Sequence, residues 1–219
     1  SSDAYGAALR QSLIDEGVDL SKCPSGSEPT TLAVTALRDD GSASYTFYVN
    51  GTADRLAQPV PVESGYAVFG TLSLALEPGS LRYAEAARVS ADNGAIVCLD
   101  PNLRPAFSSE KHRLFLRGLL ESVTVLKLSD EEVEFLGDTS HVPVVVTTLG
   151  GEGIRVRAPF GVCEVQAPTV EVADTIGAGD TIMAALVHQF DARGLDRSAL
   201  LALGADEWRE ILDLSLINI

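Results

Sequence analysis

The chain has 219 residues, of which 46% are hydrophobic and 21% are charged, a composition typical of a globular protein rather than a disordered one. Its 31 acidic residues outnumber its 16 basic ones, and the formal net charge of −15 argues against nucleic acid or an anionic membrane as a partner. The chain has too few and too scattered cysteines (Cys23, Cys98 and Cys163) for a disulfide framework or a zinc site, so we expect them to behave as small apolar residues. The sequence shows no apolar run of about 18 to 20 residues and no signal peptide, and we therefore expect a cytoplasmic protein.

The first part of the chain is expected to form a helix and a β-hairpin. Residues 7–16 have helical spacing of apolar side chains, and Gly17 ends that helix. Residues 30–37 and 43–49 are β-rich runs joined by the polar turn 38–42. This hairpin falls outside the pattern of the rest of the chain, so we interpret it as a separate β flap.

From Tyr66 onward, short apolar strands alternate with helices. The strands are expected at 66–70, 95–99, 123–128, 142–148 and 154–157, and the helices at 81–90, 111–120, 181–190 and 205–214. A further helix is expected to start at Ser129, because Glu132 follows three residues later as in a capping box. The alternation indicates a single α/β domain over residues 1–219 with a mainly parallel sheet.

The most informative stretch is residues 174–181 (DTIGAGDT), just before the predicted helix 181–190. Its glycines allow a tight turn that brings successive N–H groups onto one point, and a helix N-terminus adds about half a positive charge there. Such a nest suits a phosphoryl group, and the carboxylate of Asp180 is placed to take a proton from an attacking hydroxyl. The plainer interpretation is a glycine turn followed by an aspartate that caps a helix.

The motif at 174–180 resembles the signature of the ribokinase-like PfkB carbohydrate kinases. Further stretches resemble that family in the expected order: DAYG at 3–6, EGV at 16–18, the lid hairpin at 28–31 and 45–48, GTAD at 51–54, DPNLRP at 100–105, KLSDEE at 127–132 and TLG at 148–150. The resemblance implies a ribokinase-like three-layer α/β/α sandwich with a small β lid, to which residues 28–52 contribute. The segments GTAD and DPNLRP look most like the fructokinase branch.

The resemblance also implies a role for each matched residue. Asp180 would be the catalytic base, and the backbone of Gly177, Ala178 and Gly179 would form the anion hole. The other implied roles are substrate binding by Asp100, Asn102 and Arg104, nucleotide binding by Lys127, Thr148, Gly150 and Gly153, water-mediated magnesium binding by Glu132, and potassium binding by Asp174 as in some members.

The chain departs from the family pattern at two places. Ser129 stands where the family usually has asparagine, three residues before Glu132. Family members open with a strand and a Gly-Gly/Asn segment that holds the sugar, and no counterpart precedes Ser1. We therefore expect this sequence to be part of a longer protein.

The expected activity is ATP-dependent phosphorylation of a sugar hydroxyl with Mg²⁺, with fructose as the favoured acceptor. Alternatives are 2-keto-3-deoxygluconate, another sugar or a nucleoside as acceptor, or a binding protein that has lost turnover. A dinucleotide enzyme is disfavoured, because no glycine-rich turn follows a first strand with an acidic residue about 20 residues on. A homodimer formed through the lid and a monomer are both compatible with the sequence.

Overall fold

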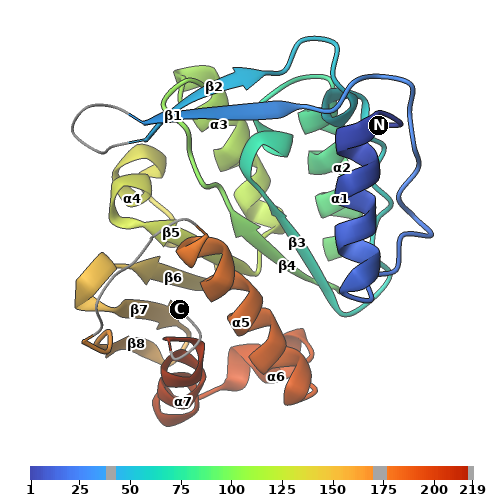
Figure 1. Cartoon of the computed structure of the whole chain (residues 1–219). Helices are drawn as coiled ribbons and strands as arrows, with labels where there is room; N and C mark the ends of the chain where they lie inside the picture. The colour runs from blue at the N-terminus through green and yellow to red at the C-terminus, as the bar shows by residue number, and fades with distance from the viewer. Residues whose placement is uncertain (38–42, 170–176, 217–219) are drawn as a thin grey trace. The chain divides into compact units, whose positions relative to one another are not determined.

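A computed structural model describes residues 1–37, 43–169 and 177–216. The chain divides into two compact units, each described by itself (Figure 1). Unit 1 comprises Ser1–Val60 and Leu76–Tyr83, and unit 2 comprises Pro61–Ala75 and Ala84–Ile219. The single kinase domain expected over residues 1–219 stays a prediction.

Unit 1 contains the first helix and the hairpin. Helix α1 (Ala4–Asp15) begins at the N-cap Asp3, whose carboxylate accepts a 2.8 Å hydrogen bond from the Gly6 N–H. Strands β1 (Leu32–Leu37) and β2 (Ala43–Tyr48) pair antiparallel, as the sequence predicts, and the short 3₁₀ turn Ala53–Leu56 follows them. The role of this hairpin as a lid stays a prediction.

The apolar side chains of α1 lie largely in solvent. Leu9, Leu13 and Ile14 are 59%, 43% and 52% exposed. The helical spacing of these residues correctly predicts a helix. The apolar face that they share is exposed to solvent.

Unit 2 is built on a six-stranded sheet in the order β3-β4-β5-β6-β7-β8. Its strands are β3 (Tyr66–Gly70), β4 (Ile96–Asp100), β5 (Val125–Ser129), β6 (Val144–Thr148), β7 (Ile154–Ala158) and β8 (Gly161–Val165). Strands β3 to β6 pair parallel with their neighbours, and β7 pairs antiparallel with both β6 and β8. This confirms the mainly parallel sheet of an α/β fold.

Helices lie in the connections between β3, β4, β5 and β6, and further helices follow β8. They are α2 (Gly79–Asp92), α3 (Glu110–Leu119), α4 (Asp130–Leu136), α5 (Ala178–Ala192), α6 (Arg197–Ala202) and α7 (Ala205–Leu216). Helix α4 begins in the predicted capping box of Ser129 and Glu132. None of the helices in the described ranges is long and apolar enough to cross a membrane.

The core of unit 2 lies on both faces of the sheet. Ile96 and Cys98 belong to a buried cluster that includes residues of α5 and α7, and Figure 1 shows α5 crossing that side of the strands. Because side chains alternate along a strand, Val97 and Leu99 point to the opposite face, and they are buried as well. Helices therefore cover both faces, as in a three-layer sandwich.

The cysteines are not alike. Cys98 and Cys163 are free thiols in the core, and burial raises the pKa of Cys98 to about 12. Cys23 is exposed, so it lacks the burial that is typical of a small apolar residue.

Candidate active site

The carboxyl ends of the parallel strands meet at one edge of the sheet. Gly70 pairs with Asp100 at the ends of β3 and β4, and Ser129 pairs with Thr148 at the ends of β5 and β6. A Cβ atom at Gly70 would lie only 2.1 Å from the carbonyl oxygen of Asp100, so this close approach requires glycine. Open α/β sheets bind their ligands at this edge.

The N-terminus of α5 carries the Gly-Ala-Gly-Asp motif. Gly177 is the N-cap and has φ +79°, a left-handed conformation that favours glycine. Asp180 lies in the first turn with its side chain exposed. The first N–H groups of a helix have no partner within that helix, so residues 177–179 present donors that an anion can use. Asp174, the expected potassium ligand, lies outside the described residues.

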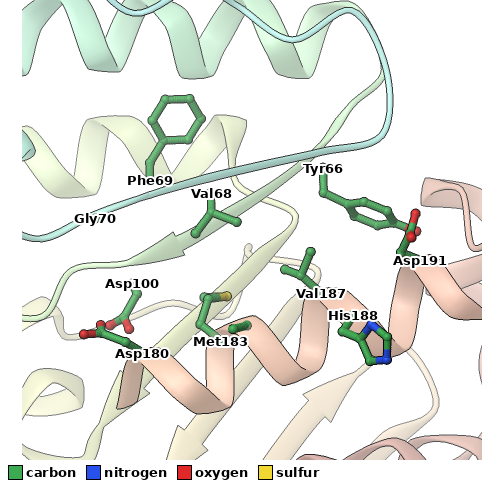
Figure 2. Close-up of a pocket in the computed structure, with 11 residues that line it drawn as sticks. Tyr66, Val68, Phe69, Gly70, Asp100, Asp180, Met183, Val187, His188 and Asp191 are labelled. Carbon is green, nitrogen blue, oxygen red and sulfur yellow. The ribbon is translucent and has the colours of Figure 1, made fainter. Parts of the chain in front are cut away.

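A cleft of about 550 Å³ runs along α5 from this point. Its lining is Tyr66, Val68, Phe69, Gly70, Asp100, Asp180, Met183, Ala184, Val187, His188 and Asp191. Figure 2 shows the carboxylates of Asp100 and Asp180 at one end of the cleft and His188 and Asp191 towards the other. The walls between them are mostly apolar, a combination typical of small-molecule sites.

The loop after β4 reaches Asp180 through Asn102. The Asn102 Nδ2 donates to Asp180 Oδ1 at 3.4 Å, and the Arg104 guanidinium donates to Asn102 Oδ1 at 2.5 Å. Asn102 has φ +44°, which is uncommon for a residue with a side chain and is tolerated best by asparagine and aspartate. The loop thus connects Arg104, Asn102 and Asp180 in one chain of hydrogen bonds.

Glu132 ties this loop to α4. Its side chain is buried; Oε2 accepts from the Ser129 N–H at 2.8 Å and Oε1 accepts from the Leu103 N–H at 2.7 Å. The first bond belongs to the capping box, and the second crosses to the loop after β4. The position that the family pattern assigns to magnesium therefore also has a structural function here.

Asp100 and Lys127 form a buried ion pair on neighbouring strands. Lys127 Nζ lies 2.7 Å from Asp100 Oδ2, and the side chains of Lys127 and Asp100 are 6% and 8% exposed. Burial raises the pKa of Asp100, Lys127 opposes that rise, and the negative charges of Glu132 and Asp180 add to it. The three carboxylates are thus close enough to interact electrostatically.

The expected nucleotide residues other than Lys127 lie at the end of β6 and in the turn before β7. Thr148 Oγ1 donates to the Leu128 carbonyl oxygen at 3.3 Å. Gly150 and Gly153 have φ +55° and +110°, and a Cβ at Gly153 would lie 2.0 Å from the Val165 carbonyl oxygen.

The apolar walls of the cleft were not among the residues that the sequence singles out. Met183 and Val187 recur at helical spacing on α5, and Tyr66 and Val68 alternate on β3, so both sets fit an ordinary core pattern. His188 also lines the cleft. Only the fold could distinguish a cleft wall from a core face at these positions.

The carboxylates fit a magnesium ion that is held through water. Among the described residues, no group of three or more His, Cys, Asp or Glu side chains could hold a metal ion directly. Magnesium usually keeps several of its waters when a protein binds it. A hydrated cation would reduce the repulsion that the negative charges of Glu132 and Asp180 exert on Asp100.

The chain is similar in sequence to known carbohydrate kinases. Residues 2–206 match the family described as pfkB family carbohydrate kinase. Fructokinase-1 of Zea mays is 32% identical over 210 residues, which cover 85% of this chain and 65% of that protein. The chain spans less than two thirds of the length of the curated plant fructokinases that it matches.

Solved structures have the same fold. Fructokinase from Vibrio cholerae O395, in a form with fructose, ADP and calcium ion bound, superposes with a TM-score of 0.77 at 26% identity over 98% of this chain and 73% of that one. Fructokinase from Xylella fastidiosa with bound ATP superposes with a TM-score of 0.85 at 23% identity over 96% of this chain and 73% of that one. These neighbours confirm the ribokinase-like α/β sandwich that the motifs imply.

Proposed function

Because the chain belongs to the pfkB family of carbohydrate kinases, we propose that it transfers the γ-phosphoryl group of ATP to a sugar hydroxyl, with fructose as the favoured acceptor. The observation that carries this proposal is the position of Asp180, exposed in the first turn of α5 at the end of an apolar-walled cleft. The fructokinases among its relatives, one of them with fructose and ADP bound, support the choice of acceptor.

In the proposed reaction, Asp180 takes the proton of the attacking hydroxyl while the N–H groups of Gly177, Ala178 and Gly179 stabilise the charge on the transferring phosphoryl group. A general base contributes about 10²- to 10⁴-fold to such reactions. The N-terminal end of α5 adds its partial positive charge at the same place. Asn102, which donates to Asp180, would orient the carboxylate towards the hydroxyl.

Substrate and nucleotide would meet at the carboxyl edge of the sheet. Arg104 and Asn102 would face the sugar and phosphate region, and Thr148, Gly150 and Gly153 would contact the nucleotide, with Lys127 nearer to the phosphates. ATP bound in the Xylella fastidiosa neighbour supports ATP as the donor. The β1–β2 hairpin would close over the sugar, alone or paired with a second copy of the chain.

Glu132 would hold magnesium through water, and the ion would neutralise charge on the nucleotide phosphates. Asp174 would bind a supporting potassium ion.

The test is ADP release with ATP, Mg²⁺ and K⁺, measured separately with fructose, ribose, 2-keto-3-deoxygluconate and adenosine. The wild-type protein is expected to release ADP only with its acceptor, and fructose is expected to be the best. Asp180→Asn is expected to lower kcat by about 10²- to 10⁴-fold, because it removes the base and keeps the shape. An unchanged far-UV circular dichroism spectrum would verify that the variant is folded.

Two outcomes would contradict the proposal. Turnover of Asp180→Asn within a few-fold of wild type would overturn the assignment of the base. Binding of a sugar or of ATP without any ADP release would instead favour the alternative of a binding protein without turnover.

A further inference from the structure

The buried pair of Asp100 and Lys127 has unused hydrogen-bonding capacity. Among the residues that the structure describes, buried Asp100 Oδ1 has no hydrogen-bond partner. A lysine ammonium can donate three hydrogen bonds, and within the described ranges Asp100 is the only acceptor for Lys127. Burying an ion pair is costly unless further hydrogen bonds satisfy it, so an incompletely satisfied pair is a poor device for stability alone.

The strand register directs this pair towards α5. Ile96 and Cys98 on β4, and Val125 on β5, belong to the cluster packed with α5. Since side chains alternate, Asp100 and Lys127 share that face of the sheet. The two residues are thus on the side where the Gly-Ala-Gly motif begins.

Gly179 leaves room for the Lys127 ammonium. A Cβ atom at Gly179 would lie 3.1 Å from Lys127 Nζ and 3.7 Å from its Cε. Gly177 has a positive φ, whereas none is found at Gly179, so a side chain at position 179 would meet no backbone strain but would crowd the Lys127 ammonium. The ammonium therefore lies against the first turn of α5, beside the proposed anion hole.

We propose that Asp100 is a positioning residue for phosphoryl transfer, which holds the Lys127 ammonium against the first turn of α5 so that it donates a hydrogen bond to the transferring phosphoryl group. This inference rests on the proposed kinase function. In the transfer, the sugar oxygen forms a bond to the γ-phosphorus, the bond from that phosphorus to the β–γ bridging oxygen breaks, and ADP leaves with the electron pair. Asp180 receives the hydroxyl proton, and Lys127 keeps its protons throughout.

The decisive variant is Asp100→Asn combined with Lys127→Met. It removes both charges with little change in shape, so no unpaired charge is left buried, and the fold is expected to persist. If Lys127 stabilises the phosphoryl group in transit, kcat is expected to fall by about 10²- to 10³-fold, as for the loss of one oxyanion-hole donor. The KM values for ATP and for the sugar are expected to stay within about threefold, because the contact strengthens during transfer.

A purely structural role predicts a different result. The single variant Lys127→Met leaves Asp100 as an unpaired buried charge, and a structural role predicts that the second substitution restores both stability and kcat. A double variant whose kcat lies within about fivefold of wild type would therefore overturn the proposal. The matched control is the surface pair Glu110 and Arg113, 2.6 Å apart, where Glu110→Gln with Arg113→Met is expected to leave kcat unchanged.

A second measurement does not depend on turnover. Isothermal titration with ADP·Mg²⁺, in the presence and absence of aluminium fluoride as a mimic of the phosphoryl group in transit, is expected to show tighter binding with the fluoride in wild type. In the double variant, the increase in affinity caused by the fluoride is expected to be at least tenfold smaller, while the affinity for ADP without fluoride is expected to equal that of wild type. A double variant that keeps the gain shown by wild type would overturn the role of Lys127. A wild-type protein without the gain, together with failure of every sugar to promote ADP release, would instead overturn the kinase function on which that role rests.

Discussion

Glu132 uses both of its carboxylate oxygens to accept backbone N–H groups, one within the cap of α4 and one from the loop after β4. The first of these contacts follows from the local spacing of Ser129 and Glu132, so the sequence could predict it. The second joins residues 29 positions apart, and no local pattern carries it. The same division holds for Asp180, whose place at a helix start is local and whose bond to Asn102 depends on the fold.

Replacing Glu132 should therefore affect stability as well as any role with magnesium. Glu132→Ala leaves two backbone N–H groups without their acceptor, and we expect a loss of about 1–3 kcal/mol in the free energy of unfolding. Glu132→Gln keeps one acceptor oxygen and should lose less. Urea unfolding followed by circular dichroism measures both. The control is Glu131→Ala on the same turn, expected within about 0.5 kcal/mol of wild type; an equal loss in the two alanine variants would contradict the contribution of these hydrogen bonds.

Among the elements, those with a strong local signal could be predicted from the sequence. The strand Tyr66–Gly70 is predicted with its observed bounds, and α5 starts three residues earlier than Thr181, where the glycine motif itself enters the helix. Two elements were missed. Helix α6 has only 6 residues, too few for a clear helical period, and β8 (GVCEV) begins with a glycine and carries one glutamate, a weak alternation.

Helix α1 gives a prediction about pH. Hydrogen bonds from the Thr30 hydroxyl and N–H and from the Gly6 N–H lower the pKa of Asp3 from 3.8 to about 2. Because the pKa is lower in the folded chain, these bonds stabilise the fold fully above about pH 3.8, and their contribution is lost as the pH falls through about 2.

The measurement is an NMR titration of the Gly6 and Thr30 amide resonances, whose midpoint is expected near pH 2. Asp3→Asn serves as the control, since it removes the titrating group and should abolish the transition. A midpoint near the ordinary value of 3.8 would show that the Asp3 cap does not persist in solution.

At the scale of the whole molecule, the two units differ in what they bury. The described residues of unit 1 include no buried hydrophobic side chain, whereas unit 2 buries large ones such as Leu126, Phe190 and Trp208. This division is not visible in the sequence, because apolar residues are as regular in α1 as in the core strands. Periodicity predicts that a segment has an apolar face, but not whether another element covers that face.

Hydrogen exchange should follow this difference. Backbone amides in α1 and in the β1–β2 hairpin are expected to exchange at least about 100-fold faster than those of β4 and β5, because few buried apolar contacts oppose local opening in unit 1. Exchange followed by mass spectrometry of peptic peptides measures both regions in one sample, so β4 and β5 are the internal control. Equal protection in α1 and β5 would contradict the expectation.

The packing of Trp208 has a practical consequence for optical spectroscopy. It is the only tryptophan of the chain, and its ring meets Phe190 of α5 edge to face at a centroid distance of 5.7 Å. Intrinsic emission excited at the red edge of the indole absorption band thus comes from a single chromophore on α7 in the core of unit 2. Its partner Phe190 lies on α5, ten residues after Asp180. A fluorescence melting curve therefore follows the unfolding of unit 2 and does not detect the unfolding of unit 1. A chain in which only the β1–β2 hairpin is unfolded would give the same emission as the native chain.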